Sequence, residues 1–261
     1  MCSIQRFRLA FLLKSGSRTR KDGIVSESSR WMKIRPVATV LALALLIPFQ
    51  GSAALIAISQ VYGGGGNSGA TLTNDFVELY NPGPGALNLT GWTVQYASST
   101  GSSWQSTPLA GSIAAYSYYL VQEAQGAGGT TPLPTPDAAG TIPMSSTTGK
   151  VALVSGAVSL SGTCPSSASI VDFVGYGAAN CFEGSGAAPA LSNTLAALRL
   201  SGGMIDTDNN SADFFAGAPD PRNSASAPNA PVPEPGTPML AVLGLVTLAV
   251  ARSRTRSREA A

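Results

Sequence analysis

The sequence predicts an all-β sandwich, and three observations carry that prediction. Between residues 55 and 200, short runs of β-branched and aromatic residues recur between clusters of Gly, Pro, Ser and Asn. Their spacing is typical of two packed sheets, and a length of about 170 residues suits a single core. No stretch of this body shows the 3.6-residue apolar stripe of an amphipathic helix.

Each predicted strand is bounded by turn-forming residues. In the second one, Val77 and Leu79 alternate with Glu78, so we expect one buried face and one solvated face. After the turn at 81–85 the core continues through closely spaced apolar residues. The expected strands are 55–62, 76–80, 91–97, 113–122, 151–155, 170–176 and 197–200.

Two segments carry too little apolar sequence for strands. Residues 123–149 are mostly Gly, Thr and Pro and too long for a hairpin connection, so they form either a mobile insertion or a binding loop. Residues 218–235 are rich in Pro, Asn, Ser and Ala, which is typical of an extended linker. We therefore expect a folded domain at 55–223 and a linker at 224–232 that projects it.

The N-terminal region predicts export. Residues 32–54 combine a basic start, an apolar run and small residues, the pattern of a signal peptide cleaved after Ala53 or Ala54. Met32 is then the expected true start, and residues 1–31 are a mis-assigned N-terminal extension. The alternative is a genuine long basic region before the apolar run.

An exported protein folds in an oxidising compartment, where paired cysteines form disulfides. Signal cleavage removes Cys2 and leaves Cys164 and Cys181. A bond between them would close a loop and contribute roughly 3 kcal/mol in the chain-entropy model. The alternative is two buried thiols; zinc is disfavoured because the chain has no histidine to complete a site.

The C-terminal end combines three features in a fixed order. The triad Pro233, Glu234 and Pro235 is followed by an apolar run at 239–251 and then by a basic cluster. At about 1.5 Å per residue a helix over that run spans about 20 Å, short of the roughly 30 Å hydrocarbon core, which predicts transient insertion. The basic cluster stays cytoplasmic, so the body is exported. Its members are Arg252, Arg254, Arg256 and Arg258.

This arrangement at residues 233–258 resembles the PEP-CTERM sorting signal of Gram-negative bacteria. The resemblance implies that an exosortase reads and removes the signal after transient anchoring in the inner membrane. The protein would then reach the cell surface or the extracellular matrix. An ordinary tail anchor is the alternative, with the same orientation.

The charge of the body excludes one class of partner. The chain has a net charge of +2, but its basic residues gather at the two ends, and the body holds three basic against ten acidic residues. Such a body repels phosphate backbones, so direct nucleic-acid binding is not expected. The three basic residues are Lys150, Arg199 and Arg222.

Catalytic motifs are scarce. Without histidine, neither a Ser-His-Asp nor a Cys-His arrangement can form. Residues 64–69 fit the dinucleotide pattern G-x-G-x-x-G, but a polar turn and a strand follow where a helix would have to hold a pyrophosphate. Glu78, Asp172 and Glu183 are candidates for acid-base chemistry, yet nothing in the sequence brings two of them together. We therefore expect a protein that is not an enzyme.

One cluster of hard oxygen ligands offers a calcium candidate. It consists of Asp206, Asp208, Asn210 and Asp213, and it lacks the Gly and the Glu that an EF-hand loop needs at its sixth and twelfth positions. The preferred interpretation is a set of side chains that cap a tight turn. Apart from this calcium candidate, no cofactor is expected.

An ordered series of motifs covers most of the body. They lie at 55–69, 74–81, 89–96, 171–177 and 206–210. Together they resemble the bacterial branch of the lamin tail domain, from about residue 55 to residue 223. The resemblance implies a small immunoglobulin-like β-sandwich without catalytic residues, which often accompanies an extracellular nuclease or phosphatase domain.

Three function classes remain. Export and the missing catalytic groups favour a non-enzymatic cell-surface or matrix protein whose domain serves for binding or display. Signal peptidase and an exosortase would process it, and extracellular polysaccharide or surface proteins would be its later partners. An accessory module to a separately encoded secreted nuclease or phosphatase is the alternative, and an enzyme that uses only carboxylates and hydroxyls is the third class. Tyr116, Tyr118 and Tyr119 offer aromatic faces for stacking, or else pack in the core.

Overall fold

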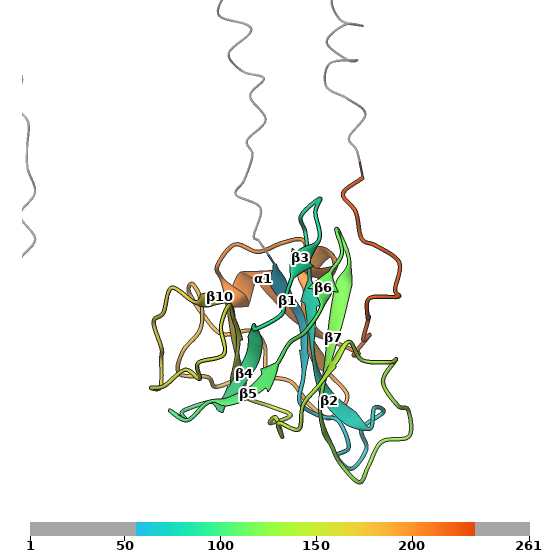
Figure 1. Cartoon of the computed structure of the whole chain (residues 1–261). Coiled ribbons are helices and arrows are strands. Elements are labelled where there is room, and N and C mark those ends of the chain that lie inside the picture. The colour runs from blue at the N-terminus through green and yellow to red at the C-terminus, as the bar shows by residue number, and fades with distance from the viewer. Residues whose placement is uncertain (1–55, 233–261) are drawn as a thin grey trace, which may run out of the picture. The chain divides into compact units, whose positions relative to one another are not determined.

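The computed structural model describes residues 56–232, which form two main β-sheets packed face to face (Figure 1). The expected signal peptide at 32–54, the extension at 1–31 and the sorting signal at 233–258 lie outside the described residues. Within the described part, no helix has the length and apolar character to cross a membrane.

The larger sheet, which we call sheet A, has the strand order β12-β11-β1-β2-β7-β8. Its neighbours pair antiparallel, except that β8 runs parallel to β7. The strands are β1 (Ala57–Tyr62), β2 (Asn74–Tyr80), β7 (Tyr118–Gln125), β8 (Ala138–Ala139), β11 (Ala196–Arg199) and β12 (Phe214–Gly217).

The smaller sheet, sheet B, has the order β10-β9-β4-β5 and is fully antiparallel. Its strands are β4 (Thr93–Ser98), β5 (Gln105–Pro108), β9 (Gly149–Val154) and β10 (Ile170–Tyr176). A separate ribbon pairs β3 (Leu87–Asn88) with β6 (Ser112–Ile113). The helical elements are the 3₁₀ turn η2 (Leu200–Gly203) and the single turn α1 (Asn210–Asp213).

The core forms because alternate side chains of both sheets point to the same interior. Val77 and Leu79 of β2 face inward, as the alternation around Glu78 predicts, and join Val151 of β9 and Val174 of β10 in one buried cluster. The expected solvated face is wrong, because other parts of the chain cover the opposite side of β2 and bury Glu78 as well. This layering confirms the all-β, immunoglobulin-like sandwich that the sequence predicts.

The strand predicted at 113–122 is two elements in the structure. The chain turns between β6 and β7, where Tyr116 adopts a left-handed φ of 55°. Four strands, β3, β5, β8 and β12, lie outside the predicted ranges, and β3 and β8 are only two residues long. β5 is polar and ends in a proline, and β12 is only four residues long, so neither shows a period-2 apolar pattern.

The segment 123–149 is an ordered surface layer, not a bare loop. It contributes β8, and its residues Ile142 and Met144 are buried in the core. The glycine-rich stretch at 64–69 meets it closely: a Cβ on Gly66 would lie 2.2 Å from the backbone of Gly126, so both positions need glycine.

Each sheet also has an outer face that the chain covers. A loop containing residues 156–169 lies over sheet B, and residues 218–232, which we call the strap, lie over sheet A and run past β7 (orange-red in Figure 1). The expected linker at 224–232 is therefore packed against the domain as far as Asn229. Its composition is that of a linker, but its binding partners belong to distant strands, which composition cannot reveal.

Candidate functional site

A network of ion pairs surrounds Arg199, the last residue of β11. Its Nη2 lies 2.7 Å from Asp172 Oδ2, and its Nη1 lies 2.7 Å from Asp206 Oδ1 and 3.4 Å from Asp213 Oδ2. The guanidinium also lies 4.5 Å from the ring centre of Phe214. Arg199 and Asp172 are both buried, so their charges are paired with each other inside the protein and are not solvated by water.

The network closes a seam where strand pairing is irregular. The register of β1 shifts between Ile58 and Gln60, and that of β10 shifts between Ile170 and Asp172. The Ile58 N–H donates to the Asp172 carboxylate, and the Ile58 carbonyl accepts a hydrogen bond of 2.8 Å from Arg199 Nε. The two side chains thus satisfy backbone groups of β1 that would otherwise be buried without a partner.

The four calcium candidates do not converge on one point. Asp213 accepts hydrogen bonds from Thr207 N and Thr207 Oγ1 at 2.8 and 2.7 Å, and Asp206 binds Arg199. Asn210 joins β10 to the segment after Cys181, because it bonds Gly175 N, Phe173 O and the Glu183 carboxylate. Asp208 is exposed, with a left-handed φ of 53°. The contacts of Asp213 and Asn210 are those of side chains that fix turns.

A different set of carboxylates lies close together. Oxygen atoms of Asp172, Glu183 and Asp206 all lie within 4.8 Å of one another. Two of the three residues considered for acid-base chemistry, Asp172 and Glu183, are therefore neighbours, whereas the third, Glu78, belongs to β2 and binds the strap. The folded chain makes this grouping by bringing residues 183 and 206 beside β10.

The carboxylates of this group and Arg199 shift one another's pKa values. Burial raises the pKa of Glu183 to about 8, and the charges of Asp172 and Asp206 add to the rise. Glu183 is therefore protonated at neutral pH. Burial alone would lower the pKa of Arg199, but the surrounding carboxylates outweigh it and raise that pKa.

A metal ion at this place would compete with the guanidinium. The residues that could hold it are Asp172, Glu183 and Asp206, but Asp172 and Asp206 already bind Arg199, whose positive charge would repel the ion. The arrangement does not fit a resident cation. It fits an internal ion network that ties β1, β10 and β11 to the turn at 206–213.

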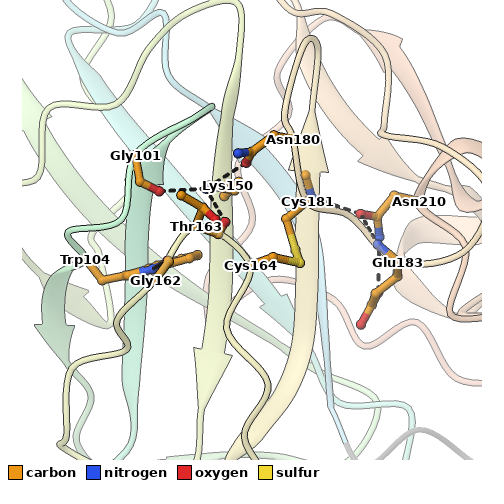
Figure 2. Close-up of a disulfide and its surroundings, with 11 residues drawn as sticks. Gly101, Trp104, Lys150, Gly162, Thr163, Cys164, Asn180, Cys181, Glu183 and Asn210 are labelled. Carbon is orange, nitrogen blue, oxygen red and sulfur yellow. Dashed lines mark hydrogen bonds between the residues drawn. A yellow bond between two sulfur atoms is a disulfide. The ribbon is translucent and has the colours of Figure 1, made fainter. Parts of the chain in front are cut away.

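The predicted disulfide is present, with Cys164 and Cys181 joined and their Cα atoms 5.3 Å apart. Figure 2 shows that it lies beside a cage around Lys150. The Lys150 ammonium donates to Gly101 O at 2.8 Å, to Thr163 O at 2.6 Å and to Asn180 Oδ1 at 3.0 Å. All three of its protons have acceptors, although burial lowers the pKa of Lys150.

The cage and the disulfide are linked along the chain. Two of the three acceptors, Thr163 and Asn180, directly precede the two cysteines (Figure 2). Trp104 lies 5.7 Å from the ammonium, measured to the ring centre, and donates its indole N–H to Gly162 O at 3.0 Å. The disulfide thus holds together the two chain segments that supply Thr163 and Asn180 as acceptors of the cage.

The third basic residue, Arg222, fixes the strap to sheet A. It donates through its backbone N, Nε and Nη2 to the Glu78 carboxylate at 2.7, 3.2 and 2.7 Å. Its guanidinium stacks 3.8 Å from the ring centre of Tyr118. Beside it is a hollow of about 200 Å³, lined by residues that include Leu198, Phe215 and Arg222.

The aromatic residues proposed for stacking are mostly internal. Tyr118 and Tyr119 are each 2% exposed, on opposite faces of sheet A, so neither offers a free ring. The Tyr118 hydroxyl accepts from Arg222 and donates to Gly202 O, and the Tyr119 hydroxyl donates to Ala110 O. Tyr116 is half-buried in the turn before β7.

Sequence reasoning missed the Arg199 network, although a signal for it existed. Arg199 interrupts an apolar stretch, Ala197 to Leu200, that is predicted as a strand. An arginine inside a buried strand needs carboxylate partners, because an unpaired buried charge is strongly destabilising. An arginine at this place predicts an ion pair, but the sequence does not show which carboxylate is its partner.

Comparison with protein-family models agrees with the architecture. The family model described as "Lamin Tail Domain" matches residues 50–178, a region that includes β1 to β10. A crystal structure of a DUF4876 family protein from Bacteroides thetaiotaomicron is similar to the chain at 13% identity and a TM-score of 0.44, covering 70% of this chain and 75% of that one. No curated protein matches the chain. Since β11 and β12 extend sheet A beyond the matched region, the chain carries a lamin-tail-like β domain that continues to residue 217.

Proposed function

We propose that the protein is a non-enzymatic module that is exported, sorted by an exosortase, and bound or displayed at the cell surface or in the extracellular matrix of a Gram-negative bacterium. The observation that carries this proposal is how the domain uses its cations. Each basic side chain between residues 56 and 232 is bonded inside the fold. Lys150 lies in its carbonyl cage, Arg199 in its carboxylate network and Arg222 on Glu78.

This use of charge leaves no basic side chain free at the surface of residues 56–232, where Asp208 and Asp220 are the exposed acidic residues. Such a surface offers phosphate backbones no cation to bind, so it favours neutral partners over nucleic acid and other polyphosphates. Extracellular polysaccharide and surface proteins fit that description. The disulfide supports an oxidising compartment, which agrees with the proposed export.

Processing is the first test of the proposal. The mature protein, isolated from its host, should begin at Ala54 or Leu55 and should lack Arg258, which intact mass measures directly. A mature species that still carries Arg258 would contradict sorting by an exosortase. A native protein found only in the cytoplasm would contradict export altogether.

Activity and partner capture are the second test. The exported protein should not hydrolyse DNA in the presence of magnesium or calcium, and it should co-purify with the extracellular matrix of its own host. Metal-dependent nuclease activity that survives repurification would overturn the non-enzymatic assignment. Stimulation of a separately purified secreted nuclease or phosphatase would favour the accessory role instead.

A further inference from the structure

We propose that the strap, residues 218–232, is a releasable tether that controls how far the folded domain stands from the sorting signal. This inference rests on the proposed function, since it assigns a task to the segment between the domain and the signal at 233–258. The two halves of the strap, residues 218–222 and residues 223–232, are held in different ways.

The first half is held by a buried lock. The Gln60 side chain donates to Asp220 O and accepts from Asp220 N at 3.1 Å, so it pairs with the strap as a neighbouring strand would. Two residues later Arg222 binds Glu78, whose side chain is fully buried. An ion pair whose carboxylate is shielded from water and bonded several times resists opening, even though the Arg222 side chain is partly exposed.

The second half is held mostly by exposed contacts, apart from a part-buried bond from the Tyr80 hydroxyl to Asn229 O. Asn223 Nδ2 donates to Thr135 O at 2.9 Å, and Asn229 Nδ2 donates to Ser201 O at 2.9 Å, both at the surface. The Asn229 N–H also donates to Tyr116 O at 2.8 Å. Water competes for such bonds, so this half opens at a lower free energy than the lock.

The two ends of the described body lie at one end of sheet A. Asn229 O accepts from the Tyr80 hydroxyl, and Tyr80 pairs with Ala57 at the start of β1. The chain therefore enters and leaves the described domain at the same end of sheet A.

The docked strap leaves little slack. Only four peptide units separate Asn229 from Pro233, which reach about 13 Å when extended. Release of the second half, with Arg222 still locked, leaves eleven units and a reach of about 36 Å. The docked form holds the folded domain close to the sorting triad, and the released form gives a membrane-embedded processing enzyme room to reach it.

Trypsin can report the two halves separately, because Lys150, Arg199 and Arg222 are the only cleavage sites between residues 56 and 232. The variant Ala225→Lys adds a site in the exposed half. With the exported protein under native conditions, we expect cleavage after residue 225 first, after Arg222 at least tenfold more slowly, and after Lys150 last. The third cut reports global unfolding, since Lys150 lies in β9.

The lock is tested by Glu78→Gln, which removes the charge that Arg222 binds. We expect faster cleavage after Arg222 with no change after Lys150. The matched control is Glu123→Gln, a buried glutamate of the adjacent β7 that does not contact the strap. Cleavage after Arg222 at the same rate as after Lys150 in the unmodified protein would overturn the proposal, since the strap would then open only when the whole domain unfolds.

Processing in the host separates this inference from the proposed function. Glu78→Gln should speed loss of the C-terminal arginines several-fold, whereas six Gly/Ser residues inserted after Val232 should make processing equally fast with and without that substitution. Equal rates in all variants would overturn the tether. No processing in any variant would contradict exosortase sorting, while the trypsin order would still report on the strap.

Discussion

The outer faces of the two sheets are covered by the same chain in two different ways. Over sheet B the cover is apolar and covalent: Trp104 packs against Phe173 at 5.8 Å between ring centres, and the Cys164–Cys181 disulfide closes the loop above them. Over sheet A the cover is polar and reversible, with Arg222 as its main attachment. A covalent cover opens only in the presence of a reductant, whereas a hydrogen-bonded cover opens by thermal fluctuation.

The difference between the two covers indicates which parts of the domain should move. The cover of sheet B contributes to stability and keeps Lys150 in its cage, so it belongs to the rigid part. The cover of sheet A joins the domain to the proposed sorting signal, and there a reversible contact has a use. Four predictions test this contrast, in decreasing order of the effect we expect.

The first prediction removes the covalent cover. The double variant Cys164→Ser and Cys181→Ser should lose about 3 kcal/mol of unfolding free energy in urea, because the bond closes a loop with a sequence separation of 17. If the lock is independent of the disulfide, trypsin should cleave after Arg222 at the same rate in this variant and in the unmodified protein. Simultaneous loosening of the strap would show that the two covers are coupled.

The second prediction contrasts two buried glutamates of neighbouring strands. Glu78 points outward and binds Arg222, whereas Glu123 points inward and accepts a hydrogen bond from Ile142 N. Burial raises the pKa of Glu123 to about 7, so its proton stabilises the folded state below the unfolded pKa near 4.5, and this contribution is lost as the pH rises through 7.

Glu123→Gln keeps a neutral side chain at every pH and should abolish that loss, which is on the order of 3 kcal/mol between pH 4.5 and pH 8. The measurement is the unfolding free energy in urea at several pH values, for the variant and the unmodified protein. Parallel pH profiles would contradict a protonated Glu123. Asp75 and Glu183, whose pKa values burial raises to about 7 and about 8, remain in both proteins and contribute to the residual slope.

The third prediction tests whether the disulfide supports the Lys150 cage. Lys150→Met should cost about 2 kcal/mol, because Gly101 O and Thr163 O lose their donor. In the background without the disulfide the same substitution should cost less, with a coupling energy of at least about 0.5 kcal/mol, since Thr163 and Asn180 adjoin the two cysteines. Strict additivity in this cycle would mean that the cage forms without the bond.

The fourth prediction addresses the weak half of the strap. Asn229→Ala should lower the unfolding free energy by less than about 1 kcal/mol, because its lost side-chain bond to Ser201 O is exposed. It should nevertheless speed trypsin cleavage at a lysine placed at residue 225. Asn193→Ala is the matched control, a half-buried asparagine like Asn229, whose side chain bonds Asn67 and Ser68 away from the strap, and it should leave that cleavage unchanged.

Local patterns in the sequence determined the class of this fold. Alternation in residues such as Val77, Glu78 and Leu79 requires only neighbours in the chain, so the inward face of β2 and the two-sheet core could be predicted. The burial of the face that carries Glu78 could not be predicted, because distant segments of the chain cover it. The disulfide followed from the number of cysteines and the expected compartment. Short polar strands such as β5 could not be found this way, because they form only where a longer strand offers an edge.

The tertiary structure alone decided how the charges are paired. Arg199 lies 27 positions from Asp172, and Arg222 lies 144 positions from Glu78. The order of strands in the sheets sets both pairings, and no periodicity encodes that order. The same reason explains the strap, whose composition of Pro, Ser, Asn and Ala describes a free linker, but which is bound because sheet A presents Gln60, Glu78 and Tyr118 along its path.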